Sequence, residues 1–324
     1  MVEQHNTDVR SFTYAVIPNG PYRPLAVPNG NDDCNINSAP CPLRWKPPCG
    51  WTINIEDDVR PNQACNLHGV RCTYTDSEEK VHTLVVHFPP ALYRGGGIAG
   101  WQHGNDRWPV FVYIHGNKGE NTNFFSNLGR RRQELPGVHF AREHFIVVSP
   151  SCHWPWTSVP MMWPLEAVDN LRTAHWVDPT RMYLAGHSMG GMNALELAAH
   201  DQGLFAAIAV ASGYHKPERR DQLARALRGR PIIEIASRHD STCPWNKQLP
   251  LWQKLATEGA AVDLLESLHT DHGKVFDTAF LDTLDVYRFL LHHKLLEDKY
   301  MRIRRGGAYC VYIVNELTGE IHWA

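Results

Sequence analysis

A serine flanked by glycines stands between a predicted strand and a predicted helix. Gly186-His187-Ser188-Met189-Gly190 has the pattern G-x-S-x-G, after the β-rich run 181–185 and before the Ala-, Leu- and Met-rich run 189–200. A sharp strand-to-helix turn crowds its central residue, and glycines two positions before and after it relieve that crowding. The helix N-terminus also stabilises negative charge near the serine. The pattern predicts that Ser188 is a nucleophile; the alternative is a chance match in a glycine-containing loop.

The segment around this serine resembles a known family. Residues 178–191 read D-P-T-R-M-Y-L-A-G-H-S-M-G-G, which is similar to the D-P-x-R-x-Y-L-x-G-x-S-M-G-G block of α/β-hydrolase esterases. The likeness is greatest to the carboxylesterase, polyester-depolymerase and feruloyl-esterase-like branch, and it extends over residues 65–296. It implies the α/β-hydrolase fold and a serine esterase that needs no metal or organic cofactor.

The resemblance also implies an oxyanion hole after the predicted strand 110–114. Residues 115–120 read H-G-N-K-G-E, similar to the family's H-G-x-x-G-E-like turn. Backbone N–H groups of that turn face the carbonyl oxygen that becomes negative during attack. The expected donors are the amides of Asn117 and Met189, with Lys118 as the alternative to Asn117. A plain turn at a strand end is the structural alternative.

Asp240 is the expected acid of the triad, because the order in this fold is serine, acid, histidine. The turn after the predicted strand 231–236 is similar to the family's H-G-x-x-D-x-x-V-P, with Asp240 on the aspartate and Cys243-Pro244 on V-P. Ala236-Ser237 departs from the usual H-G. Capping of a helix N-terminus is the structural alternative for Asp240. Its rivals are Asp263, inside a strand, and Asp271 and Asp277, which come late.

His272 is the expected base. Residues 276–282 and 286–291 read F-D-T-A-F-L-D and V-Y-R-F-L-L, which resembles the family's closing helix. The family's histidine precedes the aromatic residue by three positions, so His272 fits better than His269. The resemblance implies that Asp240 orients His272, which takes the proton of Ser188 during acyl transfer. Water activated by the same histidine then releases the acid.

Aromatic residues are concentrated in loops that the fold would place around the nucleophile. We expect pocket walls from residues 117–125, 152–164, 213–216 and 241–252, with no large lid domain. Residues 152–164 read C-H-W-P-W-T-S-V-P-M-M-W-P. Trp154, Trp156 or Trp245 would stack an aromatic acyl group or a polymer chain. The alternative is a satellite hydrophobic cluster under a long loop.

The elements that position these residues alternate between strand and helix, which predicts an α/β fold with a mostly parallel sheet and helices on both faces. Residues 1–64 are rich in Pro, Gly and Asn, and we expect an irregular arm there. Residues 65–297 form the predicted catalytic domain, closed by one long helix over 276–296. Residues 298–324 form the predicted tail.

The tail resembles half of a WW module. Residues 312–323 read Y-I-V-N-E-L-T-G-E-I-H-W, similar to Y-Y-V-N-x-x-T-G-E-x-x-W. The pattern itself predicts two strands joined by a turn at 317–319. A working WW module would bind a Pro-rich peptide. The simpler expectation is a β-hairpin that packs on the hydrolase body.

The composition is that of a globular protein, with 43% hydrophobic and 20% charged residues among 324. Lys and Arg total 32 against 34 Asp and Glu, and the net charge of −2 disfavours a nucleic-acid partner. The longest strongly apolar run, 204–211, is much shorter than the about 20 residues that span a bilayer. Neither a nucleic acid nor a membrane span is therefore expected, and the resemblance to esterases implies a small or polymeric ester as the partner.

Eight cysteines are present, five of them before residue 73, and no C-x-x-C pair occurs. Zinc is therefore not expected, and reduced thiols are favoured over one or two disulfides. Residues 1–20 carry Glu3, Asp8 and Arg10 and no apolar segment. We therefore expect a cytoplasmic protein, or a secreted one if a leader was trimmed.

Two other functions compete with the esterase. A serine peptidase or acyl-peptide hydrolase of the same fold usually carries an extra gating domain, for which about 60 N-terminal residues are too few. A catalytically silent scaffold used for binding would not need Ser188, Asp240 and His272 together. Active-site labelling separates the silent scaffold from the two enzymes.

Overall fold

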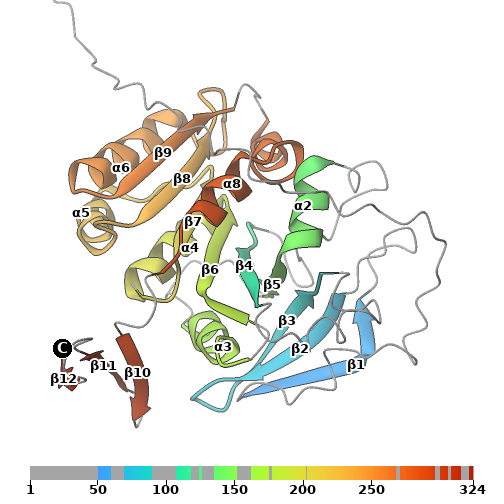
Figure 1. Ribbon diagram of the computed structural model, residues 1–324. Coiled ribbons are helices and arrows are strands. Elements are labelled where there is room, and N and C mark those ends of the chain that lie inside the picture. Colours follow the sequence, from blue (N-terminus) through green and yellow to red (C-terminus); the bar gives the residue numbers. More distant parts are fainter. Residues whose placement is uncertain are drawn as a thin grey trace, which may run out of the picture. The chain divides into compact units, whose positions relative to one another are not determined.

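The computed structural model describes residues 50–59, 69–89, 107–117, 124–125, 135–151, 162–174, 177–201, 203–267, 271–295, 300–305, 308–314 and 321–323. Nine strands form one sheet in the order β1-β2-β3-β5-β4-β6-β7-β8-β9 (Figure 1). Their bounds are β1 (Trp51–Val59), β2 (Gly69–Thr75), β3 (Val81–His87), β4 (Trp108–Ile114), β5 (Ile146–Pro150), β6 (Val177–His187), β7 (Ala207–Ala211), β8 (Pro231–Ala236) and β9 (Ala261–Glu266).

The sheet is antiparallel from β1 through β3 to β5 and parallel from β5 to β9. Helices connect the parallel strands, as crossover connections require. The described helices are α2 (Pro136–His144), α3 (Trp163–Leu171), α4 (Met189–His200), α5 (Pro217–Ala226), α6 (Trp245–Thr257), α7 (His272–Phe276), the π-helical η4 (Asp277–Asp282) and α8 (Asp285–His292). No helix among them is long and apolar enough to cross a membrane.

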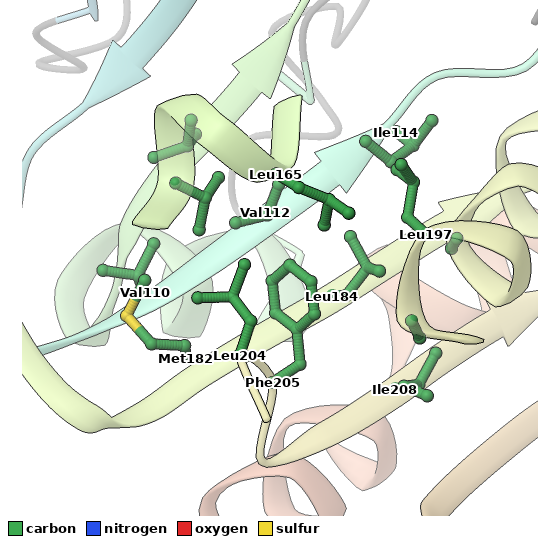
Figure 2. Close-up of a cluster of buried hydrophobic side chains, with 14 of the residues drawn as sticks. Val110, Val112, Ile114, Leu165, Met182, Leu184, Leu197, Leu204, Phe205 and Ile208 are labelled. Atoms are coloured by element: carbon green, nitrogen blue, oxygen red, sulfur yellow. The ribbon is translucent and has the colours of Figure 1, made fainter. Parts of the chain in front are cut away.

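Two hydrophobic layers cover the sheet because successive side chains of a strand point to opposite faces. Val110, Val112 and Ile114 of β4 belong to one layer, with Leu165 of α3 and Leu197 of α4 (Figure 2). Residues of α5 and α6 belong to the same layer. Phe111 and Tyr113 of the same strand belong to the other, with residues of α2, η4 and α8. Helices on both faces confirm the predicted α/β architecture. Every residue of β7 is buried, as its unbroken apolar run predicted.

Strand β1 corrects the expectation of an irregular arm over residues 1–64. Trp51–Val59 contains no proline and pairs antiparallel with β2. The buried Trp51 side chain fixes its start, since the indole Nε1 donates to the Ala167 carbonyl at 3.0 Å. No proline occurs between Pro48 and Pro61, and the strand lies within this interval. Residues 1–49 lie outside the described part of the chain.

The expected single helix over 276–296 is also wrong, because it breaks into η4 and α8. Thr283 between them is extended, with φ −123° and ψ 167°. Side chains satisfy carbonyl groups that the break releases. Thr283 Oγ1 donates to the Thr278 carbonyl at 3.2 Å, and Tyr287 donates to that of Phe280 at 2.8 Å.

The tail contains more than the expected hairpin. Its strands β10 (Tyr300–Arg305), β11 (Ala308–Val314) and β12 (Ile321–Trp323) form a three-stranded antiparallel sheet in that order. The pair β11–β12 corresponds to the two predicted strands, and β10 was not predicted. The turn at 317–319 lies outside the described residues. The WW likeness and the Pro-rich ligand stay predictions.

His87 is a buried histidine at the end of β3. Neither ring nitrogen has a hydrogen-bond partner within the described part of the chain, and the ring meets Phe125 edge-on at 4.7 Å between centroids. Burial lowers the pKa of His87 to about 3. The folded protein therefore holds this imidazole neutral where the unfolded chain binds a proton.

This burial predicts that the protein loses stability in mild acid. The folded-state pKa of His87 is depressed, so its contribution is present above the unfolded value of about 6.5 and is lost as the pH falls toward 3. We expect His87 by itself to lower the free energy of unfolding by about 1.4 kcal/mol per pH unit in this window. Urea unfolding of His87→Leu should lack this slope, and the exposed-site control His139→Leu should keep it. An unchanged slope in His87→Leu would count against the prediction.

Candidate active site

Ser188 lies in a sharp turn between β6 and α4. It is one of the few described non-glycine residues with positive φ, at φ 58° and ψ −125°. A Cβ on Gly190 would overlap the Ile114 carbonyl oxygen, and one on Gly186 would overlap that of Gly190. The backbones of β4, β6 and α4 therefore meet at this turn, and only glycine fits at both positions. The Ser188 amide donates to the Ala211 carbonyl at 2.8 Å, which fixes the strained residue against β7.

Asp240 and His272 are hydrogen-bonded to each other. Asp240 lies in the turn after β8, His272 is the first residue of α7, and Nδ1 of the imidazole is 2.7 Å from Asp240 Oδ2. Nδ1 must carry the proton here, because a carboxylate only accepts. This leaves Nε2 as the nitrogen that could accept a proton from a nucleophile.

The Asp240 carboxylate is buried, with 2% of the residue exposed. Oδ1 accepts the amides of Thr242 and Cys243, each at 2.9 Å, and Oδ2 accepts the Ser212 hydroxyl at 2.8 Å. Burial raises the pKa of Asp240, but the Cys243, His272 and Ser212 hydrogen bonds outweigh it and bring the pKa below its ordinary value. The carboxylate is therefore ionised at neutral pH. It does not cap α6, whose N-cap is Pro244.

None of the other described candidates for the acid is hydrogen-bonded to His272. Asp263 lies in β9, as expected, and burial raises its pKa. The Asp271 side chain caps α7 by accepting the Lys274 amide at 3.1 Å, and Asp277 pairs with the Lys274 ammonium at 3.0 Å. His239 is exposed. The rival base, His269, lies outside the described residues.

Cys243 connects Ser188 to the Asp240–His272 pair. The Ser188 hydroxyl lies close enough to the Cys243 side chain to act on the thiol, where it opposes the rise of the thiol pKa. The Cys243 sulfur, a carboxylate oxygen of Asp240 and a ring nitrogen of His272 all lie within 4.8 Å of one another. Among the described residues, no hydrogen bond joins the Ser188 side chain to His272. Catalytic hydrogen bonds are often long or absent without substrate, so the missing bond does not exclude His272 as the base.

The Cys243 thiol is buried, and burial together with the Asp240 charge raises its pKa to about 12. A protonated thiol is a poor nucleophile, so Cys243 is a hydrogen-bond partner here. The sequence comparison placed Cys243 on the family's valine and assigned it no role. Its position three residues after Asp240 was the one indication in the sequence that Cys243 lies near the site.

His187 was also missed. Its ring lies 4.5 Å from that of His272 between centroids, and its Nε2 is 3.1 Å from the His272 carbonyl oxygen. The same ring contacts Phe276 at 5.6 Å. His187 therefore ties the turn of Ser188 to the helix that carries His272.

The predicted oxyanion turn borders Ser188. A Cβ on Gly116 would lie 3.2 Å from the His187 carbonyl oxygen and 3.5 Å from Ser188 Cβ. Asn117, the next residue, is exposed, whereas Lys118 lies outside the described residues. Met189 begins α4, and none of the described residues accepts a hydrogen bond from its amide. Both expected donors are thus near the Ser188 turn, at a helix N-terminus and a strand end.

Of the three tryptophans predicted to line the pocket, the structure describes one. Trp154 and Trp156 lie outside the described residues. Trp245 is the first residue of α6, which corrects the expectation that residues 241–252 form a loop wall. The Arg238 guanidinium lies 4.9 Å from the centroid of the Trp245 ring and pairs with Glu266 at 2.8 Å. One face of this indole is therefore occupied by a cation.

Asp240, Cys243 and His272 are also the types of residue that hold a soft metal ion. The Asp240 oxygens already accept four hydrogen bonds from within the chain. Metal binding would have to break the bond that holds His272. The donor set fits proton transfer better than metal binding.

The comparisons with known proteins agree with this geometry. Residues 166–276 match the family model "Putative esterase", a stretch that contains Ser188, Asp240 and His272. A thermostable esterase matches with 18% identity and a TM-score of 0.51 over 70% of this chain and 63% of its own. The chain has the α/β-hydrolase fold. The fold predicted from the sequence is therefore confirmed.

Other α/β-hydrolase structures are similar in fold alone at such low identity. The Pyrococcus horikoshii acylaminoacyl peptidase has 14% identity and a TM-score of 0.50 over 71% of this chain, but 41% of its own. The Clostridium thermocellum feruloyl esterase module has 14% identity and a TM-score of 0.50 over 74% of this chain and 95% of its own. The chain thus spans less than two thirds of the length of the thermostable esterase and of the acylaminoacyl peptidase. No curated protein matches the sequence.

Proposed function

We propose that this chain is a serine hydrolase that cleaves carboxylic esters through an acyl-enzyme. The observation that carries the proposal is the 2.7 Å bond between His272 Nδ1 and the buried Asp240 carboxylate, beside the strained turn of Ser188. An acid, a base and a hydroxyl on a strained strand-to-helix turn are the parts that nucleophilic acyl transfer needs.

Each step uses a group of this chain. His272 Nε2 takes the Ser188 proton as Oγ bonds to the acyl carbon, and Asp240 stabilises the resulting imidazolium. The amides of Asn117 and Met189 stabilise the oxygen that becomes negative. The imidazolium gives its proton to the leaving alcohol as the C–O bond breaks. Water then attacks the acyl carbon, His272 takes its proton, and the carboxylic acid leaves while Ser188 regains its own.

An ester is favoured over a peptide as the substrate. The matched family model is that of an esterase and includes all three proposed catalytic residues. The feruloyl esterase module is matched over 95% of its own length. A small or polymeric ester with an aromatic acyl group would suit the predicted Trp154, Trp156 or Trp245 pocket.

Matched ester and amide substrates test this proposal. We expect the purified protein to hydrolyse nitrophenyl acetate, methyl hydroxycinnamates and the nitrophenyl ester of an N-acyl amino acid. The nitroanilide of the same N-acyl amino acid should not be cleaved. Cleavage of the anilide would establish the peptidase. A folded protein that cleaves none of them would support the silent binding scaffold.

A further inference from the structure

A second acidic side chain is buried behind Asp240 and has no part in the steps above. Glu234 lies at the centre of β8, paired with Val210 of β7 and Leu264 of β9. It is 0% exposed, and its strand neighbours Ile233 and Ile235 belong to the hydrophobic core. A carboxyl group in the middle of a core strand is costly unless it makes specific hydrogen bonds.

The Glu234 carboxyl group accepts a hydrogen bond from the chain that leaves the neighbouring strand β7. Glu234 Oε1 accepts the Gly213 amide at 3.3 Å, while the Ser212 amide donates to the carbonyl of Ile235, the next residue of β8, at 2.9 Å. The other oxygen, Oε2, is buried and has no partner among the described residues. Burial and the nearby Asp240 charge raise the pKa of Glu234 well above its ordinary value. Burial in the core therefore favours the neutral form of this carboxyl group.

Ser212 connects this acid to the proposed triad. It is fully buried and has φ 54°, a left-handed conformation that is strained for a residue other than glycine. Its hydroxyl donates to Asp240 Oδ2 at 2.8 Å, the same oxygen that accepts from His272. A Cβ on Gly213 would overlap Val210 Cγ1, so the chain must turn sharply here. Strain of this kind persists only where surrounding contacts fix it.

We infer that Glu234 is a positioning residue, which fixes the Ser212–Gly213 turn so that the Ser212 hydroxyl holds the Asp240 oxygen that orients His272. The path runs from Glu234 to the Gly213 amide, along the backbone to Ser212, and by two hydrogen bonds from the Ser212 hydroxyl through Asp240 to the imidazole. This role rests on the proposed function, because the path ends on the proposed base.

Two substitutions at Glu234 distinguish a role as hydrogen-bond acceptor from a role that depends on the charge of the carboxyl group. Gln keeps an acceptor oxygen for the Gly213 amide and carries no charge, like the protonated acid. Leu has a similar size and removes the acceptor. We expect Glu234→Gln to keep kcat within about threefold of wild type, with an unchanged pH–rate profile, and Glu234→Leu to lower kcat about tenfold with little change in KM. Ser212→Ala should have the same effect as Glu234→Leu.

The double variant Glu234→Leu with Ser212→Ala tests whether the two residues act through one path. Members of one path are non-additive, so the double variant should lose about as much kcat as either single variant. The inference is overturned if Glu234→Leu keeps its kcat, if the two losses multiply, or if Glu234→Gln is folded and as slow as Glu234→Leu. Thermal unfolding identifies any variant that fails to fold, and Glu234→Gln then carries the test.

The His272 ring provides a readout that does not depend on turnover. The Nδ1 proton should give a downfield NMR signal in wild type and Glu234→Gln, displaced in Glu234→Leu and Ser212→Ala. If wild type hydrolyses no ester, the proposed function fails, but this signal still tests the positioning role. An undisplaced signal in both Glu234→Leu and Ser212→Ala would overturn the inference by itself.

Discussion

Replacing Ser188 with alanine is expected to lower kcat for ester hydrolysis by at least about 1,000-fold, while the fold remains intact. Alanine removes the only atom that forms the proposed acyl-enzyme. Its backbone can still take the strained turn, because the glycines at 186 and 190 and the bond to the Ala211 carbonyl remain. Binding and the backbone amides near Met189 would supply any residual rate.

Steady-state hydrolysis of a nitrophenyl ester and thermal unfolding measure this effect. The matched control is Ser77→Ala, an exposed serine in the turn between β2 and β3 whose hydroxyl donates to Glu166 at 2.9 Å. This control should keep the wild-type kcat. A folded Ser188→Ala protein with an undiminished rate would mean that another group attacks the ester.

Replacing Asp240 with asparagine is expected to lower kcat by about 10,000-fold. The amide keeps an oxygen for the Thr242 and Cys243 amides, so the turn should persist. Its nitrogen would then face His272 Nδ1 and favour the tautomer with the proton on Nε2, which cannot act as a base. The charge that stabilises the imidazolium is lost as well.

Initial rates over a range of pH measure this loss, and Asp263→Asn is the matched control. Asp263 is a partly buried rival in β9, without a place in the hydrogen-bonded set around His272. We expect Asp263→Asn to retain the wild-type rate. The opposite ranking of the two variants would assign the acid to Asp263.

The sequence was most informative where local geometry constrains residue type. The glycines at 186 and 190 mark the strained turn because no other residue fits there, and the helix predicted over 189–200 begins and ends at the residues observed. The buried parallel strand β7 was predictable because an unbroken apolar run of this length is typical of a strand covered on both faces.

Errors occurred where tertiary contacts override local preference. The residues 276–296 contain no proline or glycine, and the break at Thr283 depends on bonds such as that of Tyr287 to the Phe280 carbonyl. The helix α6 was missed because Pro250 lies inside it and argues against a helix. The strand β1 was hidden by the composition of the Pro-rich residues before it.

The residues that support Asp240 and His272 could not be predicted from the sequence for a similar reason. Ser212 precedes Asp240 by 28 residues, and Glu234 bonds to an amide 21 residues away, so neither contact has a spacing that a motif would record. Glu234 interrupts an apolar strand, which was a signal of a special role without a partner to define it. The thiol of Cys243 was visible only as a departure from valine.

Labelling with a fluorophosphonate, followed by mass spectrometry of the digested protein, tests the central claim most directly. The account predicts one modified residue, Ser188, with no labelling of Ser188→Ala and much slower labelling of Asp240→Asn. Modification of Cys243 or of another serine, or a folded wild-type protein that takes no label, would contradict it.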